Sequence, residues 1–536
     1  MDILIRNGLV ADGTGNPLYP ADVQIKDDRI AAVGRLPLTQ DTRIIDATGK
    51  IVCPGFIDCH SHTDWTIHTN PTVQSTIRQG VTTEIVGNCG MGNAPTSDLS
   101  RENVASRLRE FCYEGPVTWS SFGEYLDTIS QMGTSCNLSW FVSHGAIRES
   151  VGIGGSTASS DVTEDQMRTM ENYVREAMEA GALGLSTGFE YEPGRLASTE
   201  EILRLAKVVG EYDGFYASHL RNYAESLQTA VEEFTEIVSL SGTRGQISHL
   251  NVRYNTGAAD GAWQRAVETI EQARHDGLNI QTDCVGFRDG FGCLAAILPP
   301  WLRTGGPEQT AKLLQDPKVR LKVRNECDRY WRFLHRGEWD RVRIMQNEQF
   351  PEIAGMHFFE IADLWGKDVW DCYFDILVAA GSGLDRLLAL GLVFTEEHVA
   401  EMVRHPLFSL EGDIPSSSLD GPLKNKFPYR ASFAGMIHFL TYHVKEKHTL
   451  SIEDAIRKMT SMPATHFGLR DRGFIRKGGY ADVVIFDYDQ LDDVSTNENP
   501  LAYAKGVEFV IVNGTLVVDN ANHTGTRPGR NLLRDL

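Results

Sequence analysis

Short apolar runs separated by turn signals occupy both ends of the chain. The paired runs are residues 3–5 with 9–11 around Asn7-Gly8, 21–25 with 30–33 around Asp27-Asp28, and 509–512 with 515–518 around Asn513-Gly514. Because β-branched runs that flank such dipeptides are typical of strands joined by tight turns, each pair is predicted to form a β-hairpin. Residues 481–486 are predicted to form a further strand. Because strand and hairpin patterns occur at both ends of the chain, the two ends are predicted to form one small β domain together.

The middle of the chain has a helical rhythm instead. Thr163 and Gln166 have the spacing of a capping box, and apolar residues then recur at helical intervals until Gly181. A short apolar strand follows at once, and the pairing of a helix with a strand recurs three more times. The predicted strands are residues 183–186, 215–219, 246–249 and 278–283, and the helices between them pass through 202–209, 231–238 and 263–274. This βα repetition predicts parallel strands joined by crossover helices.

Polar residues end these predicted strands about 30 residues apart, at Ser186, His219, His249 and Asp283. In a (β/α)8 barrel the same end of the strands carries the active site. A doubly wound open sheet would repeat in a similar way, but no Gly-x-Gly-x-x-Gly follows the first strand. The sequence therefore favours an α/β protein with a TIM barrel. Residues 305–405 break the spacing and are interpreted as an insertion followed by a later barrel segment.

Composition limits the classes of protein and partner. An apolar fraction of 41% and a charged fraction of 23% over 536 residues are typical of a folded, water-soluble protein. The formal net charge of -21 works against binding to nucleic acid or to an anionic membrane surface. No apolar run approaches the roughly 20 residues that span a bilayer. Because residues 1–6 also lack the basic start and long apolar stretch of a signal peptide, the expected compartment is the cytoplasm. The nine cysteines are scattered and odd in number, so no disulfide framework is predicted.

Two histidines, His60 and His62, follow an apolar run and stand two residues apart. In an extended strand such residues point to the same face, so both imidazoles could reach one metal ion. Further candidate ligands at predicted strand ends are Cys89, His219, His249 and Asp413. Each has a plainer explanation, because strand-end histidines are often structural, a cysteine can be a small buried hydrophobe, and Asp413 could cap a turn. The six together favour a metal site.

The motifs around these residues resemble those of the amidohydrolase superfamily, and within it the N-acyl-D-amino-acid deacylase (D-aminoacylase) group. The matching segments are residues 54–64, 80–90, 181–188, 218–221, 248–250 and 478–484. The Gly-Asn-Cys-Gly element at residues 87–90 selects the deacylase group. The resemblance implies a distorted (β/α)8 TIM barrel over residues 54–470 and a small β-sandwich built from residues 1–53 and 471–536.

The same resemblance implies a zinc-dependent hydrolase that cleaves an amide-type C–N bond with metal-activated water. It implies a tight zinc site at Cys89, His219 and His249. A weaker second site would use the side chains of His60, His62 and Asp413, with Cys89 as a further ligand that both sites could share. Thiolate and imidazole suit zinc, and three protein ligands leave a position open for water.

Three residues have roles that the resemblance suggests beyond metal binding. Asp413 is expected to act as the general base and acid, and Asp420 is the competing assignment for that role. Tyr191 is a candidate to bind the oxyanion, although it could equally be a packed surface aromatic. His144 is expected to support the site through hydrogen bonds rather than to catalyse.

The segments that would bind a substrate carboxylate depart from the group's pattern. Asn251 stands where the group usually has a lysine, and residues 431–435 lack the arginine of the corresponding Gly-Thr-Phe-Pro-Arg segment. The side chains of Arg253, Arg221 and Arg430 could replace these cations from another direction. Candidate apolar walls of the pocket are the aromatic residues Phe287, Phe291 and Trp301. The expected substrate is an N-acyl amino acid, of D configuration in this group, or a neutral or cyclic amide.

Two other functions stay open from the sequence. A barrel that has lost catalysis could serve as a scaffold or assembly protein, but such proteins usually lose metal ligands, and here all six candidates are present. Non-hydrolytic, metal-dependent C–C chemistry on the same scaffold is the third alternative. The expected partner is a small-molecule amide, with no nucleic acid and no membrane, and assembly into a homo-oligomer is left open.

Overall fold

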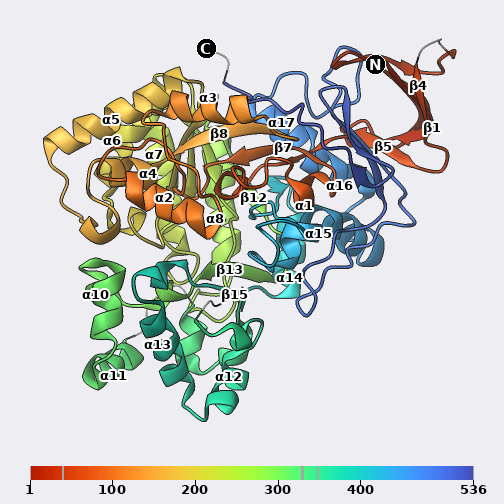
Figure 1. The fold of residues 1–536 in the computed structure, drawn as a ribbon. Coiled ribbons are helices and arrows are strands. Elements are labelled where there is room, and N and C mark those ends of the chain that lie inside the picture. Colours follow the sequence, from red (N-terminus) through yellow and green to blue (C-terminus); the bar gives the residue numbers. More distant parts are fainter. Residues whose placement is uncertain (1, 39–41, 327–330, 346, 348, 535–536) are drawn as a thin grey trace.

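The computed structural model describes residues 2–38, 42–326, 331–345, 347 and 349–534 (Figure 1). An eight-stranded parallel sheet has the order β16-β12-β11-β10-β9-β8-β7-β6. Its strands are β6 (Phe56–Asp58), β7 (Val81–Val86), β8 (Asn137–Ser143), β9 (Gly184–Gly188), β10 (Phe215–His219), β11 (Arg244–Ile247), β12 (Ile280–Cys284) and β16 (Phe408–Leu410). An isolated bridge between Ser61 and Ile414 brings the two edges together. The sheet is a nearly closed barrel, and the predicted TIM barrel is confirmed.

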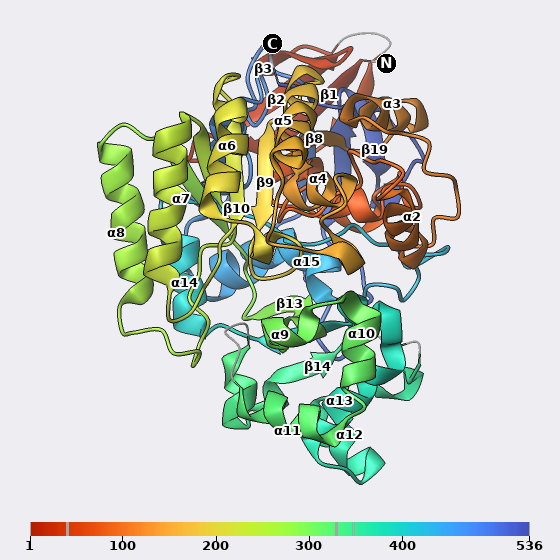
Figure 2. The ribbon, with the colours of Figure 1, turned by 90° about the vertical axis from the view of Figure 1, so that its left-hand side faces the viewer.

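Helices cover the barrel. They are α1 (Gln74–Ile77), α2 (Arg101–Glu110), α3 (Phe122–Met132), α4 (His144–Ser150), α5 (Glu164–Glu179), α6 (Thr199–Gly210), α7 (Leu227–Ser241), α8 (Ala262–His275), α14 (Glu396–Arg404), α15 (Arg430–His438), α16 (Ile452–Met459) and α17 (Ser461–Phe467). The predicted capping box starts α5, where Thr163 and Gln166 satisfy each other's backbone N–H groups. Figure 2 shows α6, α7 and α8 side by side. Each of these helices buries one apolar stripe against the barrel.

A second sheet unites the two ends of the chain. Its order is β20-β19-β18-β17-β5-β1-β2-β3, and β4 pairs with β1. The strands are β1 (Ile3–Val10), β2 (Tyr19–Lys26), β3 (Arg29–Gly34), β4 (Arg43–Asp46), β5 (Ile51–Pro54), β17 (Val483–Phe486), β18 (Val507–Val512), β19 (Thr515–Asp519) and β20 (Asn522–His523). The antiparallel pair of β5 with β17 joins the two segments. The domain boundaries given above stay a prediction.

One predicted turn in this sheet is wrong. The hairpins around Asp27-Asp28 and Asn513-Gly514 form, but β1 runs through Asn7-Gly8 without turning. Both halves of β1 pair with β2, and a register shift between Ile5 and Gly8 marks a bulge. Asn7 adopts a left-handed φ of 59°, which Asn tolerates well. A Cβ at Gly8 would lie 2.5 Å from Val52 Cγ2, so the absence of a side chain at Gly8 lets β1 approach β5.

Extra elements between β12 and β16 form the lower part of the molecule in Figures 1 and 2. They are the small antiparallel sheet of β13 (Asp289–Cys293), β15 (Leu388–Leu392) and β14 (Val342–Ile344), and the helices α9 (Pro300–Arg303), α10 (Gly306–Leu313), α11 (Pro317–Asn325), α12 (Phe358–Trp365) and α13 (Val369–Ala380). These elements begin at Asp289, before the predicted insertion at residue 305. Buried rings of Trp339, Trp370 and Tyr373 form the centre of this region.

Eight cysteines are described and none of them forms a disulfide, while Cys327 lies outside the described residues. In the described part of the chain, every helix is too short or too polar to cross a bilayer.

Candidate metal centre

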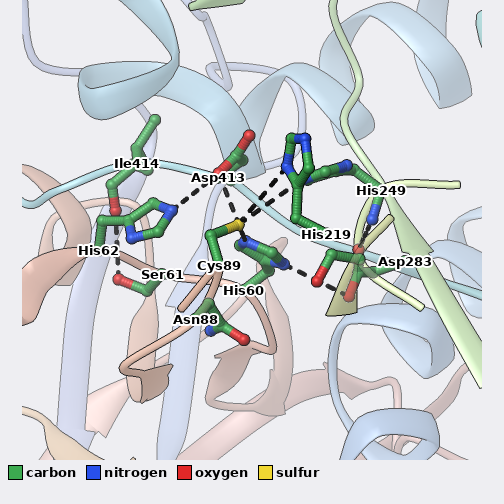
Figure 3. Close-up of polar contacts among 12 residues, drawn as sticks. His60, Ser61, His62, Asn88, Cys89, His219, His249, Asp283, Asp413 and Ile414 are labelled. Carbon is green, nitrogen blue, oxygen red and sulfur yellow. Dashed lines mark hydrogen bonds and ion pairs between the residues drawn. The ribbon is translucent and has the colours of Figure 1, made fainter. Parts of the chain in front are cut away.

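The thiol of Cys89 lies among three imidazoles. His60 Nε2 is 3.2 Å from Cys89 Sγ, His249 Nε2 is 3.7 Å away and His219 Nδ1 is 3.9 Å away. His219 Nδ1 and His249 Nε2 are 3.1 Å apart. Figure 3 shows the three rings around the sulfur atom, with Asp413 beside them. Residues that are far apart in the sequence therefore form one compact set of donor atoms.

Asp413 connects this group to His62. Its Oδ1 lies 3.2 Å from His62 Nε2 and 3.5 Å from His60 Nε2. The competing residue Asp420 is exposed, outside this cluster. The structure thus brings together all six residues that the sequence analysis selected as ligands, although their division into a tight and a weak site stays a prediction.

The barrel positions these side chains at the carboxyl ends of its strands. His219 is the last residue of β10, and the others lie in the first turns after β6, β7, β11 and β16. Three of them adopt left-handed backbone conformations, with φ of 56° at Cys89, 34° at His249 and 49° at Asp413. Such conformations cost on the order of 1–3 kcal/mol each in a non-glycine residue and cluster at functional sites. The surrounding barrel holds these three residues in place against that cost.

The electrostatics of the cluster favour ionised anionic donors. Burial opposes ionisation of the Cys89 thiol, yet the charge of His60 and the hydrogen bonds from His219 and His249 hold its pKa well below the usual value. Burial also opposes ionisation of Asp413, but the His62 hydrogen bond and the charge of His60 lower the pKa of the carboxyl. A thiolate and a carboxylate therefore stand beside several imidazoles.

This donor set suits zinc. One ligand atom from each of His60, Cys89, His249 and Asp413 lies within 4.8 Å of every other. Soft thiolate together with imidazole is the combination that zinc binds well, and a carboxylate oxygen completes its usual range of ligands. The residues present therefore fit a zinc ion.

Two residues near the cluster were missed as site residues in the sequence analysis. Asp283 is the second-last residue of β12. It accepts a hydrogen bond from the His249 backbone N–H, and its Oδ2 lies 3.7 Å from His60 Nδ1. Its position at a strand end was the available signal. Glu190 Oε2 lies 2.9 Å from His219 Nε2, and the same carboxylate pairs with Arg253. No sequence signal distinguishes Glu190, because its partners come from other strands.

His144 and Tyr191 both line a cavity of about 380 Å³ that opens at the cluster. His144 Nε2 is 2.8 Å from Glu201 Oε1, and Arg148 pairs with the same carboxylate. The Tyr191 hydroxyl donates to the Cys89 carbonyl oxygen at 2.8 Å, and its ring lies 5.1 Å from that of His219. Tyr191 therefore supports the loop that carries Cys89.

The predicted substrate residues separate into two groups. Asn251, Arg253 and Phe291 line the cavity. Arg221 does not, because Glu233 on α7 holds its guanidinium. Phe287 does not either, since its buried ring stacks on His438 with centroids 4.0 Å apart.

The last two predicted substrate residues also lie elsewhere. Arg430 is outside the cavity lining and pairs with Asp289 at 2.6 Å. Trp301 is 36% exposed, and Lys322 Nζ lies over its ring at 3.8 Å from the centroid. Neither side chain lines the cavity, because tertiary packing turned both toward other partners.

Comparisons of sequence and of structure with known proteins find the same kind of relative. The amidohydrolase family model matches residues 43–242 and 416–518. N-acyl-D-glutamate deacylase of Alcaligenes xylosoxydans xylosoxydans is 30% identical, over 100% of this chain and 97% of the relative. D-aminoacylase of the same organism is 28% identical, over 99% and 98%. The crystal structure of N-acyl-D-glutamate deacylase from Bordetella bronchiseptica, complexed with zinc and a phosphonate inhibitor, superposes with a TM-score of 0.80 at 28% identity and covers 99% of each chain.

Proposed function

The chain belongs to the amidohydrolase family, and we propose that the side chains clustered around Cys89 hold zinc and serve the hydrolysis of a small-molecule amide. The chain is a metal-dependent hydrolase that acts on C–N bonds other than peptide bonds. The residue assignment rests on one observation. The Cys89 thiol lies beside the imidazoles of His60, His219 and His249 at the carboxyl ends of the barrel strands.

Zinc is the metal of this enzyme. We propose one tight site and, beside it, a second and weaker site. A D-aminoacylase structure that superposes with a TM-score of 0.79 has a binuclear metal centre. The proposed ligands are Cys89, His219 and His249 for the tight site, and His60, His62, Asp413 and the shared Cys89 for the weaker one. An inactive scaffold would have no need to keep these donors together at the mouth of a cavity.

Asp413 is the proposed proton carrier. Bound zinc would polarise the scissile carbonyl and lower the pKa of an attached water. Because its pKa is held low, the Asp413 carboxylate is ionised at neutral pH and can accept a proton from the attacking water. The same oxygen can then deliver that proton to the leaving nitrogen. His62 and His60, at 3.2 and 3.5 Å, hold the carboxylate in place for both transfers.

Tyr191 and His144 have supporting roles in this proposal. Tyr191 would exchange its hydrogen bond to the Cys89 carbonyl for one to the oxyanion, since its hydroxyl already lies on the cavity wall. His144 would position α4 and the loop beside it, because its buried bond to Glu201 ties the end of β8 to α6.

The substrate is proposed to be an N-acyl amino acid or a neutral or cyclic amide of similar size. The relatives named above are deacylases of N-acyl-D-glutamate and an aminoacylase for D substrates. A cavity of about 380 Å³ is in the range that holds a small organic ligand.

Replacement of the thiol tests the proposal. We expect purified protein to contain zinc and to release carboxylic acid and amine from small amides, and Cys89→Ser to lose both properties. The matched control is Cys112→Ser, whose thiol contacts the Pro422 carbonyl away from the cluster. Metal analysis by mass spectrometry and an amine-release assay measure the outcome. Full zinc content and activity in Cys89→Ser would contradict the assignment.

A cytoplasmic location belongs to the same proposal. It is supported by the eight described cysteines, none of which forms a disulfide.

A further inference from the structure

Every arginine on the cavity wall already has a carboxylate partner. Among the described lining residues, four arginines are the only ones with a permanent positive charge. The pairs are Arg107 with Glu149, Arg253 with Glu190, Arg303 with Asp385 and Glu192, and Arg386 with Glu110. A free substrate carboxylate would therefore meet arginines whose charge is already matched, including Arg303, whose Nε and Nη1 lack a hydrogen-bond partner but which two carboxylates neighbour.

The pair nearest to the metal centre is the most firmly made. Arg253 Nη1 donates to Glu190 Oε1 at 2.7 Å and Nη2 donates to Oε2 at 2.5 Å. The two side chains are only 7% and 4% exposed. Taking Arg253 away from this bidentate contact would leave a buried carboxylate without its partner, which is strongly unfavourable. Arg253 is therefore a poor anchor for an anionic ligand.

The other three arginines are also paired, but Arg107 and Arg386 are 36% and 39% exposed, so solvent weakens their pairs. Arg107 Nη1 lies 2.9 Å from both oxygens of Glu149, and Arg386 Nη1 lies 2.7 Å from Glu110 Oε1. Arg303 contacts Asp385. These carboxylates also line the cavity, so they lower the potential that a second anion would experience there.

Acidic groups outnumber the arginines on the wall. Glu192 lies 3.8 Å from Arg303, which Asp385 already pairs, and Asp289 and Asp413 line the same cavity. The net charge of the whole chain, -21, adds a long-range field that disfavours the approach of anions. Apart from the metal, the described lining residues offer no surplus of positive charge.

Aromatic side chains cover the wall beside the metal centre. The Trp65 ring stacks on His62 with centroids 4.4 Å apart. Phe111 and Phe291 follow at 5.8 and 6.4 Å from Trp65. All three aromatic residues line the cavity and are only partly buried, so their rings are accessible to a ligand. This surface fits an apolar group next to the scissile bond.

We propose that the enzyme selects amides whose amine part carries no free carboxylate and bears an apolar group. The inference rests on the proposed function and specifies its substrate class. In the reaction, the oxygen of water bonds to the acyl carbon, the C–N bond breaks, and the leaving nitrogen takes a proton from that water. The products are a carboxylic acid and an amine that carries no carboxylate. An N-acyl amino acid amide or a comparable lactam has the required form.

A pair of substrates that differ only in charge tests the selectivity. Zinc-loaded full-length enzyme would be assayed with N-acetyl-D-phenylalanine and with N-acetyl-D-phenylalaninamide, and release of the deacetylated amine measured by chromatography. We expect kcat/KM to be at least about tenfold higher for the amide, because the acid would have to bury a carboxylate that no available cation pairs. A smaller preference, or a preference for the acid, would overturn the inference.

Measuring the binding of non-cleavable analogues tests the selectivity independently of whether the enzyme hydrolyses amides. The N-methanesulfonyl analogues of the same acid and amide cannot be deacylated, and isothermal titration gives their dissociation constants for the wild-type enzyme. The neutral analogue is expected to bind about tenfold more tightly. Equal or tighter binding of the acid overturns the inference whatever the activity. Failure to cleave either acetyl compound would instead count against the proposed function.

Removing the carboxylate partner of one cavity arginine tests whether this pairing causes the preference for the amide. Glu149→Gln leaves Arg107 without its carboxylate, and we expect the amide-to-acid ratio of kcat/KM to fall by about tenfold. Glu211→Gln is the matched control, because it breaks the exposed pair of Arg175 with Glu211, at 2.6 Å, outside the cavity lining. The control is expected to keep the wild-type ratio. An unchanged ratio in Glu149→Gln would refute the role of the paired arginines.

Discussion

Glu190 Oε2 lies 2.9 Å from His219 Nε2, while Nδ1 of the same ring faces Cys89 Sγ at 3.9 Å. One imidazole nitrogen is thus held by a carboxylate, and the other is presented to the proposed metal site. Arg253 holds the carboxylate in turn. A histidine ligand is usually oriented by such a partner, which also raises its basicity.

Loss of Glu190 is expected to weaken zinc binding. Glu190→Ala removes the group that orients His219, so zinc affinity should fall by about 10–100-fold, and Glu190→Gln should fall less because it can still accept a hydrogen bond. Competition with a chromogenic chelator measures the affinity. Glu233→Ala is the control, since it breaks another Glu–Arg pair, with Arg221, on α7. Equal affinities in Glu190→Ala and the control would contradict the positioning role.

Asp413 is expected to control the chemical step. Asp413→Asn keeps the size of the side chain but cannot accept a proton, so kcat should fall by about 10²–10⁴-fold. Asp420→Asn, a change of the exposed alternative residue, should leave kcat at the wild-type value. Steady-state kinetics at saturating zinc compare the two variants. A large loss in Asp420→Asn with little loss in Asp413→Asn would reverse the assignment.

Gly188 lies where the site leaves no room for a side chain. A Cβ there would overlap the Cys89 carbonyl oxygen and the Tyr191 hydroxyl. Gly188→Ala should therefore displace the loop that carries Cys89 and reduce zinc content and kcat/KM together. Gly435→Ala on α15 is the control, because its added Cβ would make an ordinary contact of 3.6 Å with Ala431. Normal zinc content in Gly188→Ala would show that the loop tolerates the displacement.

His466 is expected to make stability depend on pH. Burial, together with the charges of Arg244 and Arg274, lowers the pKa of His466 to about 3. Between pH 6.5 and 3 the unfolded chain binds a proton that the folded protein excludes, so stability is full above pH 6.5 and falls as the pH falls. From pH 7 to 4.5 the wild type should lose about 2–3 kcal/mol more than His466→Leu.

Guanidinium denaturation at the two pH values measures this difference. Leucine is a suitable replacement because the buried ring of His466 packs on the apolar rings of Phe215 and Phe467. The variant thus removes the titrating group and keeps an apolar contact. Parallel loss of stability in both proteins would show that His466 titrates normally.

Local sequence patterns were enough to predict many of the helices and strands. The helix capped by Thr163 and the strand 215–219 could be predicted because capping and periodicity depend on neighbouring residues. The Asn7-Gly8 dipeptide misled the prediction because β2 is long enough to pair with both halves of β1, and that pairing turns a potential hairpin into a bulge. Local turn chemistry was overruled by a partner strand.

The sequence by itself determined which side chains could bind a metal. Strand-end positions and motif chemistry selected His60, Cys89 and Asp413 before any contact was known, because parallel strands deliver their carboxyl ends to one face of a barrel. Only the tertiary structure decided how the charges around them are matched. Arg253 pairs with Glu190, 63 residues earlier in the chain, because two separate loops meet at the barrel mouth. Such contacts depend on the packing of distant elements, which local sequence patterns do not encode.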